Sequence, residues 1–189
     1  MTTMTKPPAN TGGRTQDEDT TVRAFADSTA TGLIMAVLTS NTAADVLNLD
    51  QDLLAGDWPT VQHHHIWQAV VAQAQQLADN GHGNTVVSAE LVYTELRRKG
   101  QLDFHVQGLL CDALGTVRGG NHLPRTAAAD YAQALKRQRL ATVCAIARDM
   151  FDTAASGSDK DVRRALAYVE NLRAKAERAG VKVDEPYFT

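Results

Sequence analysis

Residues 57–102 read DWPTVQHHHIWQAVVAQAQQLADNGHGNTVVSAELVYTELRRKGQL, and this stretch predicts two helices joined by a short loop. Pro59 and Thr60 favour the start of the first helix, because proline presets φ and a threonine hydroxyl can accept hydrogen bonds from free backbone amides. Asn80 and Gly81 favour its end, because glycine adopts the left-handed conformation of a helix cap at little cost. Between these points apolar residues recur mostly at steps of three and four, which lines one helix face. They are Val61, Ile66, Trp67, Val70, Val71, Ala74, Leu77 and Ala78.

The second helix of this stretch has its own start and end signals. Ser88 offers an N-cap oxygen, and Gly100 marks the end. Leu91, Val92 and Leu96 give the helix an apolar side. Two helices with apolar faces and a short link must pack on each other or on a third element, so this pair organises the fold.

The composition supports helices throughout the chain. The 189 residues are 43% hydrophobic, enough for a real core, yet only 5% aromatic, so aliphatic side chains and alanine must fill that core. Alanine is abundant and alternating β-branched residues are scarce. We therefore predict an all-α fold, with a compact bundle of about five or six helices followed by a long antiparallel helical hairpin.

The predicted organisation has four parts. Residues 1–24 are rich in Thr, Pro, Gly and charge, a composition that buries too little apolar surface to offset the entropy of ordering. We predict a disordered N-terminal arm there. Residues 25–124 are expected to form the bundle, residues 125–179 the hairpin, and residues 180–189 a C-terminal tail.

Three further helices are predicted inside the bundle. The first runs from near Thr29 to Leu38, the second from Ala43 to Leu47, and the third from Val106 to Leu114, where Gly115 can end it. The residues expected to face inward from the first of these are Leu33, Ile34, Val37 and Leu38.

The hairpin is predicted from two long segments with apolar periodicity. The first covers residues 125–155, and the second follows a turn at 156–159, where Ser158 or Asp159 is available as a cap. So short a link makes the two helices antiparallel. A lone hairpin leaves its outer face exposed, and we expect a partner to cover it. The candidate partner-binding residues are Tyr131, Leu135, Arg139, Val143, Val162, Leu166, Val169 and Leu172.

The sequence carries no motif for catalysis or nucleotide binding. The phosphate-binding pattern GxxxxGK[ST] is missing, because neither glycine pair is followed by Lys-Ser or Lys-Thr, and no GxSxG elbow occurs. The run His63–His65 cannot converge on one metal ion, because successive residues of a helix point about 100° apart. We expect helix-surface and core-edge histidines, no catalytic residue, no metal and no cofactor.

The charge pattern argues for weak DNA binding at most. The formal net charge of −3 gives no general attraction to nucleic acid. Lys136, Arg137, Arg139 and Arg148 form a basic cluster that can touch phosphates, but a solvated helix face with paired acids explains them more simply.

The two cysteines and the hydropathy bear on the compartment. Cys111 and Cys144 lie in apolar helical surroundings without CxxC spacing, which predicts reduced thiols in the core. No apolar run reaches membrane-spanning length, and the N-terminus has no apolar secretory core. We expect a soluble, cytoplasmic protein without membrane contact.

Several short motifs follow one another along the chain. They are Asp57-Trp58, His63-His64-His65-Ile66-Trp67, Asn80-Gly81, Glu95-Leu96-Arg97-Arg98-Lys99-Gly100-Gln101-Leu102, and Tyr131-Ala132 with Leu135, Arg139 and Leu140. Their order and spacing resemble those of the N-terminal domain of the DnaB-type replicative helicases. The resemblance covers roughly residues 26–155, with a weaker extension to about 179. It weakens after Leu102, where the Gly pair of the family appears as Gln107-Gly108 and its Tyr-Leu pair is not reproduced in register.

The resemblance implies a function in DNA replication. In the family this domain dimerises through its hairpin, builds the N-terminal collar of the helicase ring and receives primase, while the ATPase lies in a second domain. We therefore expect a non-catalytic module that forms a dimer or higher oligomer through the hairpin and binds a replicative helicase or primase. The alternatives are a subunit of a split helicase, whose motor is a separate chain, and a small DNA-binding regulator.

Overall fold

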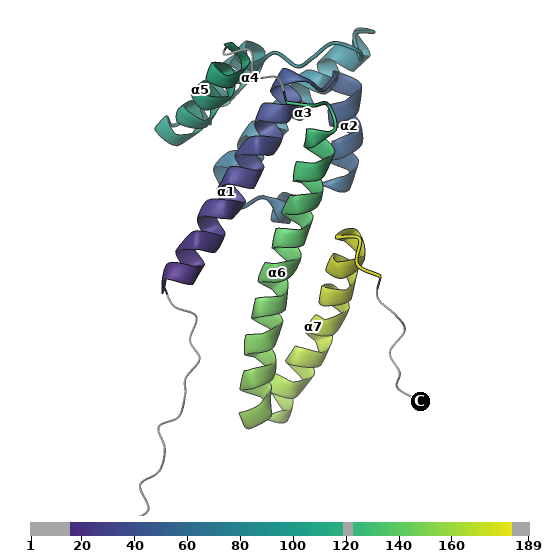
Figure 1. The fold of residues 1–189 in the computed structure, drawn as a ribbon. Coiled ribbons are helices and arrows are strands. Elements are labelled where there is room, and N and C mark those ends of the chain that lie inside the picture. The colour runs from purple at the N-terminus through teal and green to yellow at the C-terminus, as the bar shows by residue number, and fades with distance from the viewer. Residues whose placement is uncertain (1–15, 119–122, 183–189) are drawn as a thin grey trace, which may run out of the picture.

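The computed structural model describes residues 16–118 and 123–182, and every regular element within these ranges is helical (Figure 1). The all-α prediction is therefore confirmed for the described ranges. Thr42 and Val86 form one isolated antiparallel bridge. The elements are α1 (Gln16–Thr39), α2 (Ala43–Asp52), the 3-10 turn η1 (Ala55–Asp57), α3 (Val61–Asp79), α4 (Ala89–Arg98), α5 (Phe104–Arg118), α6 (Ala127–Ser156) and α7 (Asp159–Arg178).

The signals around the central pair α3 and α4 work largely as predicted. The Thr60 hydroxyl accepts a hydrogen bond from the His63 amide at 3.3 Å, and Gly81 follows α3 with φ +78°. Gly100 follows α4 with φ +66°. Ser88 occupies the N-cap position of α4, but its hydroxyl caps no helix amide and instead donates to Glu90 Oε2 at 2.6 Å.

Three predicted helix boundaries were wrong. The first helix begins at Gln16 rather than near Thr29, so residues 16–24 are helical, while residues 1–15 of the predicted arm lie outside the described ranges. The segment 17–19 reads Asp-Glu-Asp, and acidic residues favour the first turn of a helix. The second helix continues to Asp52, and Gly115 lies inside α5 rather than at its end. One glycine in a helix costs about 1 kcal/mol, which its neighbours can outweigh.

One buried core joins the helices. The residues expected to face inward from α1 are buried, as are Ile66, Trp67 and Val70 of α3. Val61 and Leu91 are exposed instead, by 63% and 47%. The largest fully buried apolar side chains are Leu33, Ile34, Val37, Val46, Ile66, Val70, Val87, Val92, Leu96, Leu110 and Leu135.

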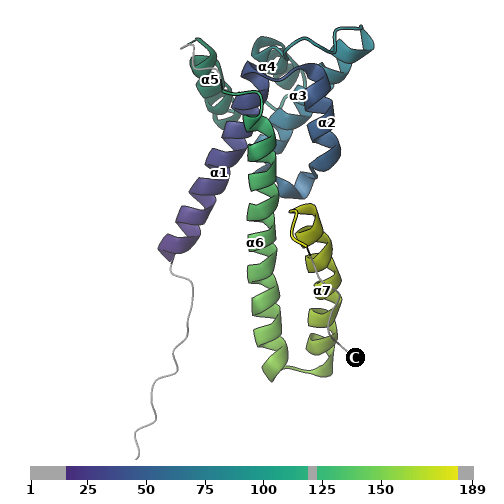
Figure 2. The same cartoon turned by 45° about the vertical axis from the view of Figure 1, so that its right-hand side comes forward.

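Helix α6 belongs to this core over its first turns and leaves it further on. Ala128, Ala132 and Leu135 are part of the buried cluster, so the core continues across the division predicted at residue 125. Helix α1 runs alongside α6 in the opposite direction, and α7 returns antiparallel along α6 after the turn at Gly157 (Figures 1 and 2). Gly32 allows the close approach of α1 and α6, because a Cβ there would lie 2.6 Å from Tyr131 Cε1.

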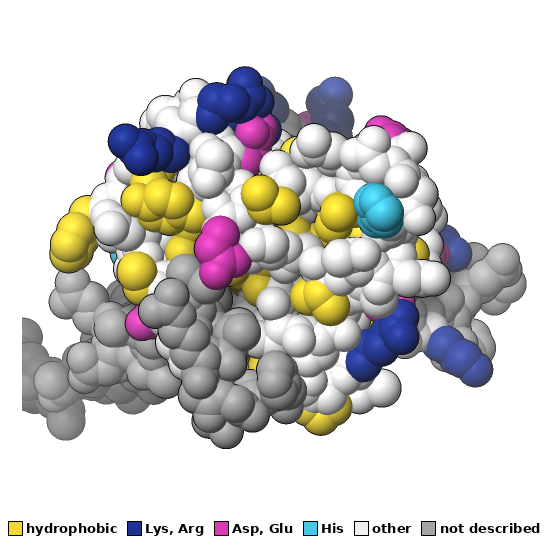
Figure 3. All heavy atoms as spheres, turned by 90° about the horizontal axis from the view of Figure 1, so that it is seen from above, with side chains coloured by type: hydrophobic (Ala, Val, Ile, Leu, Met, Phe, Trp, Pro, Cys, Tyr) yellow, Lys and Arg dark blue, Asp and Glu magenta, His cyan; other side chains and the backbone are white. Residues whose placement is uncertain are grey.

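The end of the bundle opposite the hairpin turn carries scattered hydrophobic side chains rather than one continuous patch (Figure 3). Single apolar side chains are ordinary on a protein surface and need no partner.

Candidate interaction surface

Small residues hold the two hairpin helices together. Val143 and Ala147 of α6 and Ala165 of α7 are all buried, with exposures of 2%, 4% and 1%. Asp161 stabilises the first turn of α7, since it accepts hydrogen bonds from the Ser158 amide at 2.9 Å and hydroxyl at 2.8 Å. These bonds lower the pKa of Asp161, with the backbone bond as the larger cause. Of the two candidate caps, Ser158 and Asp159, Ser158 occupies the N-cap position.

The larger apolar residues of α7 lie beside its contact with α6 and are exposed. Val162, Leu166 and Val169 are exposed by 41%, 59% and 41%, and their spacing of four and three places them on one side of the helix. Phe151 of α6 is 41% exposed. Phe151 lies four residues after the buried Ala147 of α6, and Val169 lies four residues after the buried Ala165 of α7. Each side chain is therefore rotated by about 40° around its helix axis from the buried alanine. In two antiparallel helices, equal rotations around the two axes bring side chains to the same side of the pair. Phe151, Val162, Leu166 and Val169 therefore form one apolar face.

The other predicted partner-binding residues have different surroundings. Leu135 and Val143 are buried by helix packing, while Tyr131 is half-buried and packs against Gly32, so these three side chains contribute to the fold. Leu172 and Arg139 are half-buried. Most of the predicted residues are apolar, and an apolar pattern does not reveal which side of a helix another helix covers.

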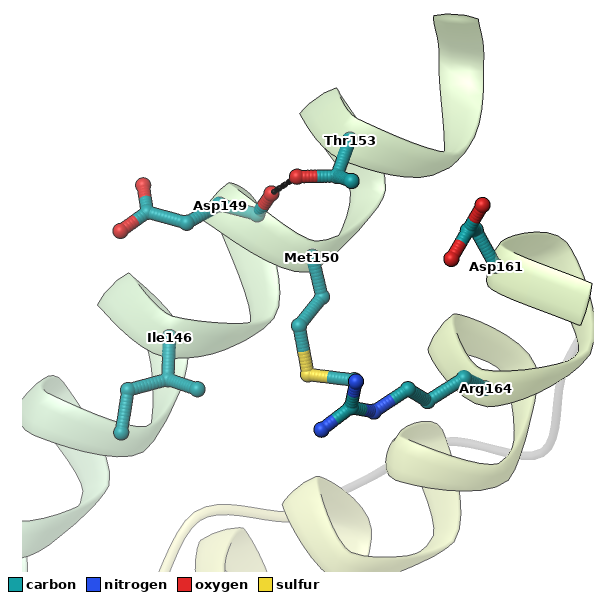
Figure 4. A pocket seen from close by; sticks show the side chains of 6 residues that line it. All are labelled: Ile146, Asp149, Met150, Thr153, Asp161 and Arg164. Atoms are coloured by element: carbon teal, nitrogen blue, oxygen red, sulfur yellow. Dashed lines mark hydrogen bonds between the residues drawn. The ribbon is translucent and has the colours of Figure 1, made fainter. Parts of the chain in front are cut away.

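The opposite side of the hairpin contains a shallow groove of about 280 Å³. Its lining residues are Ile146, Asp149, Met150, Thr153, Asp161 and Arg164 (Figure 4). The Met150 thioether and the Arg164 guanidinium reach toward each other from the two helices (Figure 4). The Thr153 hydroxyl donates to the Asp149 carbonyl at 2.8 Å, so it is already satisfied. The groove mixes apolar and charged side chains and is less uniform than the apolar face.

The free end of α7 is attached to the bundle. Arg178 donates from Nη2 to Asp57 Oδ2 at 2.6 Å and from Nη1 to Asp57 Oδ1 at 3.3 Å. Gln133 Nε2 donates to the Ala179 carbonyl at 2.7 Å. These contacts set the angle of the hairpin against the bundle, and the sequence did not reveal them.

Two tryptophans form a second concave region beside η1. The Trp67 indole donates to Asp50 Oδ1 at 2.7 Å and packs on Trp58, with ring centroids 5.2 Å apart. A depression of about 430 Å³ lies over these rings, and Lys99 and His64 stand at its wall. Both rings are more than nine-tenths buried, so they offer a ligand little surface.

His63 is a buried polar residue that the sequence analysis placed at the core edge or surface. It is fully buried, with Nδ1 2.7 Å from Thr60 Oγ1 and Nε2 3.2 Å from Thr31 Oγ1. Burial lowers the pKa of His63 from its ordinary value, and it also lowers the pKa of His64. Among the described residues no three His, Cys, Asp or Glu side chains gather to hold a metal ion.

Cys111 and Cys144 are free thiols, but their predicted place in the core was wrong, because both are exposed. Each directly follows a buried residue, Leu110 and Val143 respectively. Consecutive helical residues point about 100° apart, so the larger apolar neighbour takes the inward position.

Comparison of the chain with protein-family models, with curated proteins and with solved structures finds no match. Within residues 16–118 and 123–182, no helix is both long and apolar enough to cross a membrane.

Proposed function

We propose that this protein is a non-catalytic interaction module of DNA replication, which pairs with a second copy through the apolar face and binds a replicative helicase or primase. The proposal rests on the resemblance of residues 26–155 to the N-terminal domain of DnaB-type helicases. It rests equally on one structural observation, the row of exposed Val162, Leu166 and Val169 beside Phe151.

The apolar face has the composition of an interface centre. Water-exposed apolar area gains about 25 cal/mol per Å² when it is buried, so four adjacent large side chains favour association. Charged residues flank the row, and Arg173 and Glu177 of the same helix pair with each other at 3.3 Å. An apolar centre with a polar rim is the usual arrangement of protein–protein interfaces.

The basic cluster of α6 is better suited to contacts with a protein than to binding DNA. Lys136 lies 3.5 Å from Asp52, and only 12% of its side chain is exposed. Arg139 is half-buried, which leaves Arg137 and Arg148 as the exposed members. These two exposed cations would release few counterions from DNA, and the chain has a net charge of −3, so DNA binding through this cluster would be weak and steeply salt-dependent.

The first test is the oligomeric state. We expect light scattering to give a dimer or larger species for the parent and a monomer for Leu166→Asp/Val169→Asp, because both new charges would be buried at the interface. Ala167→Asp is the matched control, since Ala167 is exposed on the same helix outside the apolar face. A parent that stays monomeric at high micromolar concentration contradicts self-association.

The second test separates the three function classes. The purified chain should hydrolyse no ATP, bind duplex DNA only at low salt, and bind purified DnaB-type helicase or primase at physiological salt, because apolar burial is weakly screened. Surface variants are needed here, since deleting the hairpin after Ala127 would also remove Ala128, Ala132 and Leu135 from the core. Salt-resistant DNA binding without a helicase or primase partner favours a DNA-binding regulator, and ATP turnover favours an enzyme.

A further inference from the structure

Charged residues gather where η1, α6 and the end of α7 meet. Lys136 Nζ lies 3.5 Å from Asp52 Oδ2, and Arg178 holds both carboxylate oxygens of Asp57. Asp57 Oδ2 also accepts from the Leu54 amide at 2.9 Å. The two acids of this cluster are therefore already paired with two of its three cations.

The third cation, Arg139, has no such partner. Its Nε is buried without a hydrogen-bond acceptor among the described residues, and no described carboxylate lies within ion-pair distance of it. A guanidinium stays charged at any physiological pH, so loss of a proton cannot relieve the cost of burying this charge without a partner. A half-buried charge without a counter-charge destabilises a fold, which makes it a candidate for binding.

The guanidinium is accessible at Gly56. A Cβ built on Gly56 would have Arg139 Nη2 as its nearest atom, at 3.9 Å, and Gly56 itself is exposed. Because Gly56 carries no side chain, no side-chain atom of this residue covers the guanidinium at this point. Guanidinium groups bind planar oxyanions through parallel N–H donors.

We propose that Arg139, approached past Gly56, binds the carboxylate of an acidic side chain on a protein partner. One free guanidinium matches one carboxylate, whereas a nucleic-acid backbone needs several cations in a row. The site goes beyond the proposed function, because it lies at η1 and shares no residue with the apolar face of the hairpin.

Acetate is the probe for the site, used at constant ionic strength against chloride. We expect acetate to shift the Arg139 Nε–H resonance and to raise the Tm of the parent. Arg139→Met should lose the acetate-dependent rise in Tm, and its own Tm in chloride should equal or exceed that of the parent, because an unpaired buried donor is gone. Arg137→Met, an exposed arginine on the same helix, should respond as the parent does.

A designed carboxylate gives an independent test. Gly56→Asp places an acid beside Arg139 and should raise the Tm above that of the isosteric Gly56→Asn while abolishing the acetate response. Equal acetate effects on the parent and Arg139→Met would overturn the proposal. So would an Arg139 resonance that moves with duplex DNA at physiological salt and not with acetate, which would assign the site to nucleic acid. If the Arg139→Met variant still forms a dimer, self-association through the apolar face does not depend on this site, and the two proposals can fail independently.

Discussion

Arg178 at the end of α7 forms a bidentate contact with Asp57, 121 residues earlier in the chain. Only 1% of the Asp57 side chain is exposed, against 28% for Arg178. Asp57 sits in η1 and also holds the Leu54 amide, so one carboxylate fixes a local turn and the far end of the hairpin together. The angle between hairpin and bundle depends on this contact as well as on the continuity of α6.

Breaking that pair should destabilise the protein strongly. Arg178→Met leaves the Asp57 carboxylate buried without its partner, and we expect a loss of about 3 kcal/mol in the free energy of unfolding. The double variant Asp57→Asn/Arg178→Met should lose less than the sum of the two single variants, because neither charge is then left alone. Urea unfolding measures all four proteins. Strict additivity would show that the two residues do not interact.

Trp67 should be a main support of the core. It is 2% exposed, packs on Trp58 and donates to Asp50, so Trp67→Ala should cost about 3–5 kcal/mol. Trp67→Phe keeps most of the ring volume and loses the hydrogen bond, so it should cost about 1–3 kcal/mol. Thermal unfolding of both variants gives the order. A Trp67→Ala protein that melts within a few degrees of the parent contradicts the packing of α3.

Gly32 and Gly108 should respond to alanine in opposite directions. Gly32→Ala would place a Cβ 2.6 Å from the Tyr131 ring, and overpacking of this kind costs about 1–3 kcal/mol. Gly108 lies in the exposed part of α5 with no heavy atom within 4 Å of a new Cβ. Gly108→Ala should therefore add about 0.5–1 kcal/mol, because alanine is the better helix former. Urea unfolding measures the change in the free energy of unfolding for both variants. A change of the same sign in both would contradict the close contact of α1 and α6.

Acid should weaken the protein through His63. Burial holds the pKa of His63 in the folded state below its ordinary value of 6.5. As the pH falls through 6.5, His63 becomes protonated in the unfolded chain but stays neutral in the folded chain. The free energy of unfolding therefore declines between pH 6.5 and the lowered pKa of the folded state, and is constant below it. His64 contributes with the same sign.

The pH effect can be assigned by substitution. The loss of unfolding free energy between pH 7.5 and pH 5.5 should shrink in His63→Gln, whereas Gln at the exposed His82 should leave it unchanged. An undiminished loss in His63→Gln would show that other groups cause the acid sensitivity.

Local signals allowed much of the secondary structure to be predicted. The cap at Thr60 and the glycines at positions 81 and 100 act on backbone groups a few residues away. Their effect can therefore be predicted from the local sequence. The inward face of α1 followed from periodicity for the same reason. Helix lengths failed where propensity was weak, as at Gly115, because a helix end without a strong cap is decided by what packs against it.

The candidate sites depended on contacts between distant segments. The apolar pattern of α7 marked Leu166 as well as its neighbours, but only the packing of α6 shows that Ala165 faces inward and Leu166 outward. Likewise the sequence identified Arg139 as a partner-binding residue without showing that it is left unpaired.

By itself the amino-acid sequence determined that the described part of the chain is helical, where α3 and α4 begin and end, and that Leu33, Ile34, Val37 and Leu38 of α1 are buried. These features follow from interactions between residues at most four positions apart. The tertiary structure alone decided that His63 is buried, that Arg178 reaches Asp57, and that Arg139 pairs with no acid among the described residues. Each of these outcomes depends on which helices meet and at what angle, and no local pattern encodes that choice.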